Sequence, residues 1–174
     1  TSLLVSEISK YKNTLFTPQE AKKAAQLKLY QQIADIYEKY EAYLLKNNLV
    51  DFDDLLLLPY LILEKNEELA KQTSEKYRYL MVDEYQDTNE LQYKLLKKLC
   101  CTHNNLCVVG DDDQSIYGWR GATIKNILNF NEHFEDTFVV KLEENYRSTD
   151  TILDHANQLI EHNRDRLGKK LVGT

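Results

Sequence analysis

The first part of the chain has the apolar spacing of helices. A helix start is recognisable at Thr17, whose side chain can cap, with Pro18 in the first turn and Glu20 completing a capping box. Apolar side chains then recur every three or four residues, at Ala25, Leu29, Ile33, Ile36, Tyr40 and Leu44. This spacing predicts one long helix that ends near Asn47 and, because of its length, bridges two domains.

From Tyr77 onward, short apolar runs alternate with helical stretches. The runs at 79–82, 106–109 and 138–142 are short, apolar and flanked by polar residues, as buried strands are. Helical spacing occupies 88–99, 123–130 and the region around 152–160. Strands that alternate with helices predict an α/β fold with a parallel sheet.

Composition describes a soluble, intracellular type of chain. Charged residues make up 29% of the 174 positions, and the mean hydropathy is -0.55. No signal segment with basic residues followed by an apolar run opens the chain. The first residue is Thr1 rather than Met, which suggests a processed or excised segment. The longest apolar run, 55–63, is interrupted by Pro59, where the helix that begins near Asp51 is expected to bend, and it is too short to cross a membrane. We therefore expect no membrane contact.

The cysteines are three in number and do not have the spacing of a disulfide framework. A zinc site is conceivable at Cys100, Cys101, His103 and Cys107. The cysteines lie at a predicted helix end and at the start of a predicted strand, however, where cysteine usually serves as a small core residue. This pattern predicts a reducing, cytoplasmic location.

The net charge of -6 has the wrong sign for holding nucleic acid by charge alone. The basic residues cluster only near the end of the chain, at Arg164, Arg166, Lys169 and Lys170. We interpret this cluster as a solvated helix end.

Acidic residues follow two of the predicted strands. Asp83 and Glu84 come directly after the first strand, and Asp111 to Asp113 follow the second. Ligands of open parallel sheets bind beyond the carboxyl ends of the strands, so both groups are expected to line one crevice. Magnesium binds one or two carboxylates together with phosphate oxygens, and a neighbouring carboxylate can deprotonate an attacking water. The pattern is weak by itself, since acids also end strands as ordinary turn residues.

A glycine-flanked loop carries two aromatic side chains and a cation. The loop reads Tyr117-Gly118-Trp119-Arg120-Gly121. Aromatic faces stack on any base, so such a loop can hold single-stranded nucleic acid without reading its sequence. A core anchor is the alternative role for Trp119, the only tryptophan.

Three longer strings resemble the motifs of Rep/UvrD-type superfamily 1 DNA helicases, most closely those of Rep. They are VDEYQDTN from Val82, VVGDDDQSIYGWRGA from Val108 and LEENYRST from Leu142, in the order and spacing of that family. The likeness is strong over about 49–174 and loose before it. It implies a parallel RecA-like sheet of the P-loop NTPase type, incomplete here, with an α-helical insertion. It also implies three parts: the end of a helical insertion (1–48), the later half of a first motor domain (49–136) and the start of a second (137–174).

The resemblance implies a role for each motif residue. Asp83 would hold Mg²⁺, Glu84 would activate water, and Gln114 would sense the γ-phosphate of ATP. Tyr146 would stack on the adenine and Arg147 would act as an arginine finger. Tyr117, Trp119 and Arg120 would contact single-stranded DNA. Simpler roles stay open: a buried tyrosine at a strand end for Tyr146, an ion pair with Glu143 or Glu144 for Arg147, and a turn-capping amide for Gln114.

The implied protein is an ATP-dependent helicase that moves 3′ to 5′ on single-stranded DNA and opens junctions with duplex DNA. The family's phosphate-binding loop, GxxxxGK(S/T), is absent from this sequence: Gly168, the nearest candidate, is followed by Lys169 and Lys170 but lacks the upstream glycine and the hydroxyl residue. We therefore expect the chain to need the rest of a longer polypeptide for activity. The alternatives are a subunit of a related helicase-nuclease, a non-hydrolysing DNA-binding or scaffold module, and an unrelated magnesium-dependent phosphohydrolase.

Overall fold

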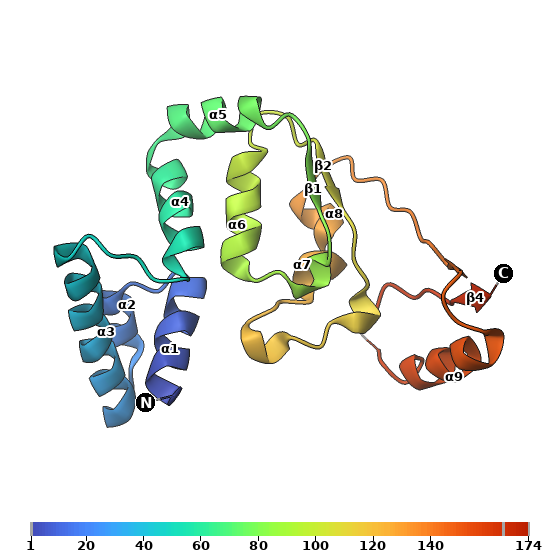
Figure 1. The fold of residues 1–174 in the computed structure, drawn as a ribbon, viewed down its shortest axis with the longest axis horizontal. Coiled ribbons are helices and arrows are strands. Elements are labelled where there is room, and N and C mark those ends of the chain that lie inside the picture. The colour runs from blue at the N-terminus through green and yellow to red at the C-terminus, as the bar shows by residue number, and fades with distance from the viewer. Residues whose placement is uncertain (1, 165, 174) are drawn as a thin grey trace.

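The computed structural model describes residues 2–164 and 166–173. In Figure 1 the chain begins as a group of helices, continues into a small sheet with helices beside it, and ends in an extended arm that carries one helix. The helices are α1 (Ser2–Asn13), α2 (Pro18–Ala24), α3 (Lys28–Lys46), α4 (Asp54–Lys65), α5 (Glu67–Lys76), α6 (Glu90–Leu99), α7 (Lys125–Leu128), α8 (Phe130–His133) and α9 (Asp150–Ile160). The strands are β1 (Leu80–Val82), β2 (Leu106–Val108), β3 (Glu144–Asn145) and β4 (Val172–Gly173), and single 3₁₀ turns are η1 (Tyr85–Asp87), η2 (Asp112–Gln114) and η3 (Gly118–Arg120).

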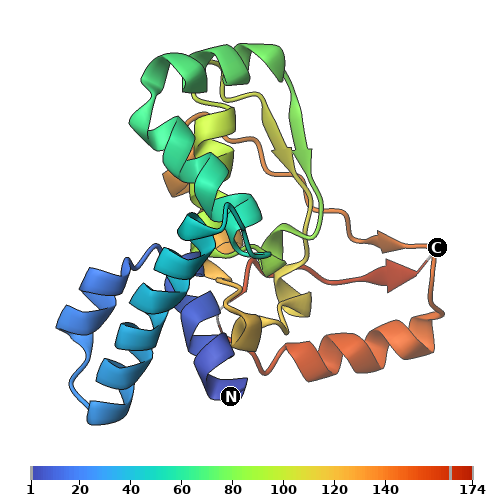
Figure 2. The same ribbon diagram turned by 60° about the vertical axis from the view of Figure 1, so that its left-hand side comes forward.

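The predicted long helix is wrong, because the chain forms two helices there. The backbone leaves the helical region at Ala25, with ψ 106°, and α2 folds back along α3. This fold-back places Ala21 of α2 in a buried cluster with Ala34 and Tyr37 of α3. In one continuous helix these residues would lie on separate turns and could not pack against one another. Lys22 forms exposed ion pairs with two acids of α3, and Figure 2 shows both helices in one compact bundle with α1. The single long helix is therefore not formed, whereas the capping box at Thr17 is confirmed.

The helix predicted from Asp51 begins slightly later, as α4, and runs unbroken past Pro59. It packs against α6, whose first turn is capped by Asn89. Leu57, Tyr60 and Leu91 form the core of this contact. The prediction of a helix over 88–99 is confirmed by α6.

Two of the predicted strands pair as expected. β1 and β2 are parallel, with Leu80 opposite Leu106 and Val82 opposite Val108. Their carboxyl ends therefore lie at the same edge, which brings the acidic groups that follow them onto adjacent loops.

The third predicted strand, 138–142, is wrong. That segment is extended but unpaired in the described part of the chain, and the Phe138 side chain is 89% exposed. Strand pairing occurs further on instead, where β3 pairs with β4 in a separate parallel sheet. An apolar run forms a buried strand only where neighbours cover both faces, and no described segment covers this one. The fold is thus a mixed helix and strand fold with two small parallel sheets rather than one.

Smaller predictions had mixed outcomes. The short helix expected over 123–130 is divided into α7 and α8, and the last helix is confirmed by α9. Cys100 is buried as expected, whereas Cys101 and Cys107 are exposed. Over the described residues, no helix has the length and apolar character needed to span a membrane.

Candidate functional site

The loop after β1 holds Glu84 in an unusual backbone conformation. Glu84 has φ 50° and ψ 42°, the left-handed region that residues other than glycine seldom adopt. Its N–H donates to Oδ1 of Asp83 at 2.8 Å, and its carboxylate accepts a hydrogen bond of 2.7 Å from Nε2 of Gln86. The carboxylate of Glu84 is thus exposed but oriented, as a general base must be.

Gln86 joins the two acidic loops. Its side chain is only 1% exposed, and its Oε1 accepts a 3.0 Å hydrogen bond from the backbone N–H of Asp111. A Cβ at Gly110 would lie 2.7 Å from that same oxygen, so the close approach requires glycine there. Sequence reasoning missed Gln86, although it lies within the VDEYQDTN string, because spacing alone gives no sign that a polar side chain turns inward.

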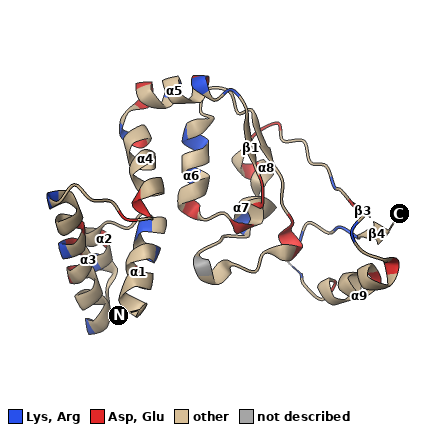
Figure 3. Cartoon of the chain, in the orientation of Figure 1, with Lys and Arg blue, Asp and Glu red and all other residues tan. Residues whose placement is uncertain are grey.

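The acidic loop after β2 is neutralised by the basic end of the chain. Arg166 donates two hydrogen bonds to the Asp113 carboxylate, at 2.9 and 2.7 Å. Lys169 pairs with Asp111, and the backbone N–H of Leu167 donates to Asp112 at 2.7 Å. The interpretation of this cluster as a solvated helix end is therefore wrong for Arg166 and Lys169. Figure 3 shows the acidic end of β2 facing the basic tail.

These contacts set the ionisation of Asp111. Burial raises the pKa of its carboxyl, but hydrogen bonds from Lys169 and Gln114 outweigh burial and leave the pKa below its ordinary value. Gln114 donates to Asp111 at 2.7 Å, which is the geometry of the turn-capping role considered for it. Its role as a γ-phosphate sensor stays a prediction.

Metal-binding chemistry is divided between the two loops. In the part of the chain that the structure describes, the one group of three candidate metal ligands consists of Asp111, Asp112 and Asp113, whose ligand atoms lie within 4.8 Å of one another. Asp83 is outside that group and is exposed. Its carboxylate accepts a hydrogen bond from the Glu84 N–H and forms no ion pair with a described residue. A single exposed carboxylate fits Mg²⁺, which takes one or two protein carboxylates together with phosphate oxygens and water.

The aromatic loop is exposed to solvent. The Trp119 side chain is 75% exposed, so the core-anchor role is wrong. Tyr117 lies beside it, with 6.4 Å between the ring centroids and 54° between the ring planes. Gly121 ends the turn with φ 90°, a conformation that favours glycine. The Arg120 side chain lies outside the described part of the structure.

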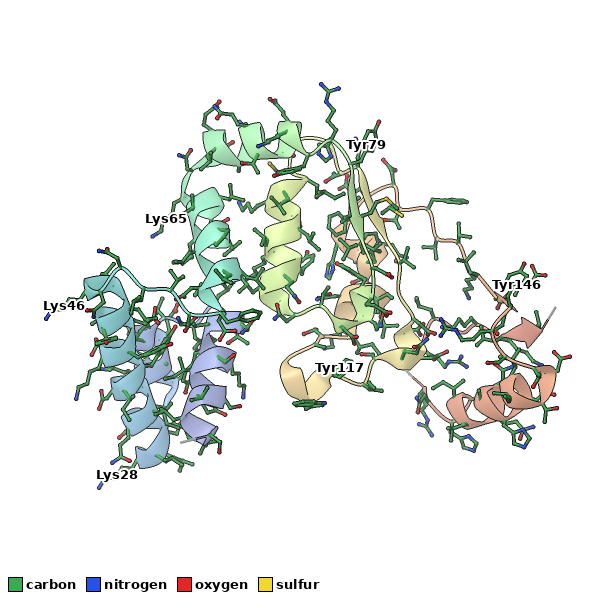
Figure 4. All side chains as sticks on the ribbon, viewed as in Figure 1. Lys28, Lys46, Lys65, Tyr79, Tyr117 and Tyr146 are labelled. Atoms are coloured by element: carbon green, nitrogen blue, oxygen red, sulfur yellow. The ribbon has the colours of Figure 1, made fainter. Side chains whose placement is uncertain are left out.

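Tyr146 and Arg147 lie in a different part of the molecule. Tyr146 is 78% exposed, which rules out a buried tyrosine at a strand end. No ion pair joins Arg147 to Glu143 or Glu144, residues that the structure describes, and its N–H instead donates to Oδ1 of Asn145. Both residues line a shallow hollow of about 370 Å³. Figure 4 labels Tyr117 and Tyr146 on separate elements.

The family of the chain follows from its similarity to known proteins. The profile of the UvrD/REP helicase N-terminal domain matches residues 2–135, so the chain belongs to the UvrD/Rep helicase family. Among curated relatives, the ATP-dependent DNA helicase PcrA of Staphylococcus epidermidis is 46% identical over 169 residues, which are 97% of this chain and 23% of the relative. The protein of the same name from Staphylococcus aureus has the same identity and coverage. The chain therefore spans about a quarter of the length of these relatives, and nothing in these matches favours Rep over other members.

Proposed function

We propose that these residues form part of an ATP-dependent DNA helicase that moves 3′ to 5′ along single-stranded DNA and separates strands at junctions with duplex DNA. Family membership and the relatives named for this activity support the proposal. The observation that carries it is the hydrogen-bonded link through Gln86, which holds Glu84 and the Asp111 loop together at the carboxyl ends of β1 and β2.

In this proposal Glu84 takes a proton from the water that attacks the γ-phosphate of ATP. The hydrogen bond from Gln86 engages Oε2 of the Glu84 carboxylate, and the residue is exposed to solvent. Asp83 would hold Mg²⁺, which supplies charge neutralisation to the phosphates when bound. Gln114, on the adjacent loop, would sense the γ-phosphate and would then exchange its present bond to Asp111 for one to the nucleotide.

Tyr146 and Arg147 would complete the site from the other side. We propose that 1–48, 49–136 and 137–174 correspond to an insertion, a first motor domain and a second motor domain. Tyr146 would stack on the adenine and Arg147 would stabilise charge on the transferring phosphoryl group. Because both are exposed and lie on another element than Glu84, they would act when the two motor domains close on ATP.

The DNA grip would come from the aromatic loop. Tyr117 and Trp119 present exposed ring surfaces, and Arg120 belongs to the same turn. Stacking on bases needs no overall positive charge, which reconciles DNA binding with a net charge of -6. The 174 residues alone are expected not to hydrolyse ATP, since they lack the loop whose N–H groups and lysine hold the phosphates.

Strand separation by the full-length protein that carries these residues tests the proposal. With ATP and Mg²⁺, we expect it to unwind a duplex that has a 3′ single-stranded tail and to leave a matched duplex with a 5′ tail intact. Glu84→Gln should abolish unwinding of the 3′-tailed duplex. Unwinding that ignores tail polarity would refute the stated direction, and unwinding by the Glu84→Gln variant would refute the assigned base.

A further inference from the structure

A groove of about 600 Å³ separates the aromatic loop from α1. One wall is formed by Gly118, Trp119 and Gly121, and the opposite wall by polar side chains of α1. Figures 1 and 2 both show the loop beside this helix, although more than a hundred residues separate them in the sequence. The groove is thus built jointly by the helical part and the sheet-containing part of the chain.

The α1 wall is held in place at its upper end. Oδ1 of Asn13 accepts a 2.8 Å hydrogen bond from Asn89, the residue that caps α6, and Nδ2 of Asn13 donates to Asp53 at 2.8 Å. Lys12, the adjacent residue, is buried among acids of two other elements. The spacing between α1 and the loop therefore rests on buried and half-buried contacts rather than on surface side chains.

The α1 wall offers groups that bind a sugar-phosphate backbone. Ser6, Ser9 and Lys10 are at i, i+3 and i+4, so they share one face of the helix. Lys10 is the only cation among the described residues that line the groove, and its ammonium makes no ion pair within the described structure. Two carboxylates, Glu7 and Glu90, also line it, and Glu90 is paired with Lys94 at 3.5 Å.

We propose that α1 is the second wall of the single-stranded DNA site, where Lys10 and the serine hydroxyls hold the phosphate of a nucleotide whose base stacks on Trp119. This inference rests on the proposed function. Sites for single strands combine an aromatic platform with a cationic track for the backbone, and the groove supplies one on each wall. Glu7, whose carboxylate makes no ion pair with any described residue, opposes the phosphate and weakens binding.

The salt dependence of DNA affinity separates these roles. We would titrate the full-length protein, without nucleotide, with an oligo-dT strand at several salt concentrations. Lys10→Ala should lower the magnitude of the slope of log K against log[salt] by about 0.7, which corresponds to about a fivefold loss of affinity at 0.1 M salt. Trp119→Ala should lower affinity without changing the slope, because stacking releases no counterions. Glu7→Gln should raise affinity.

Lys28→Ala is the matched control, because Lys28 is an exposed lysine that Figure 4 labels at the far end of α3. It should change neither affinity nor slope. Loss of affinity in Trp119→Ala together with wild-type affinity and slope in Lys10→Ala would overturn the inference and leave the proposed DNA grip intact. An unchanged affinity in Trp119→Ala would instead refute the proposed grip. Because Lys10 is exposed, its removal should leave the unfolding temperature unchanged, which confirms that a loss of affinity is local.

Discussion

Two clusters of ion pairs join distant segments of this chain, and their cations differ in exposure to solvent. Lys12 of α1 lies 2.8 Å from each of three carboxylates, those of Glu41, Asp51 and Asp54, and its own side chain is fully buried. Arg166 and Lys169 instead contact the acidic loop after β2, with side chains that are 13% and 16% exposed. Figure 3 shows both clusters as places where acidic and basic residues meet.

The difference indicates which contact is permanent. In the first cluster the Lys12 ammonium pairs with all three acids, and none of these acids pairs with another cation in the described structure. In the second, two partly exposed cations share three acids on a loop that also carries Gln114. We therefore interpret the Lys12 cluster as part of the folded framework. The acidic loop can release its basic partners at lower cost, because both cations are already partly exposed.

Removal of Lys12 should have the largest effect. Lys12→Met keeps the length of the side chain but leaves three carboxylates without this cation. Breaking a fully buried pair costs about 3–5 kcal/mol, and because two of these acids are partly exposed we expect a loss of about 3 kcal/mol or less. Urea unfolding of the full-length protein would measure this loss. Lys46→Met, on the exposed end of α3, is the control and should change stability little. If both variants unfolded at the same urea concentration, the Lys12 cluster would not be part of the framework.

Removal of Arg166 should loosen the second cluster without unfolding the protein. In Arg166→Ala the two hydrogen bonds to Asp113 disappear, while Lys169 still pairs with Asp111. We expect faster amide hydrogen exchange in 166–173 and in 111–114, with unchanged exchange in α1. Arg164→Ala, which removes an exposed arginine that makes no ion pair in the described structure, is the control. Equal exchange in both variants would show that the tail does not depend on this contact.

The smallest effect concerns the titration of Asp111. Its folded pKa is lowered, so its pairing contributes stability above the ordinary aspartate pKa of about 3.9 and loses that contribution as the pH falls through the lower folded value. Carboxyl ¹³C shifts should therefore give a midpoint below about 3.9. Lys169→Gln should move this midpoint upward. A midpoint that is the same in both proteins would mean that Lys169 does not set the pKa.

Local patterns predicted the fold best where a short string decides the local structure. The capping box at Thr17 involves adjacent residues, and β1 and β2 each form on a short apolar run before they pair across α6. The break between α2 and α3 was missed because the apolar spacing continues through it, and only the tertiary burial of Ala21 decides the matter. The prediction of a strand over 138–142 failed for the opposite reason. The composition of this segment suits a strand, but no described segment pairs with it.

The candidate site was predictable as a set of motifs but not as a network. The strings located Glu84, Trp119 and Arg147, and exposure excluded a core role for Trp119. Neither the bridge through Gln86 nor the contact of Arg166 with Asp113 was predictable, because each joins residues far apart in the sequence through side-chain geometry. Arg166 in particular looked like part of an ordinary solvated cluster.

The rate of DNA-stimulated ATP hydrolysis by the Glu84→Gln variant of the full-length protein tests the account most directly. Glutamine keeps the shape and the contact with Gln86 but cannot accept the proton of the attacking water. We predict that kcat falls by about 10²–10⁴-fold, the usual contribution of a general base, while the affinity for single-stranded DNA is retained. Glu132→Gln, which changes an exposed glutamate on α8, should hydrolyse ATP normally. A Glu84→Gln variant with the kcat of this control would contradict the central claim that the loop after β1 carries the hydrolytic base.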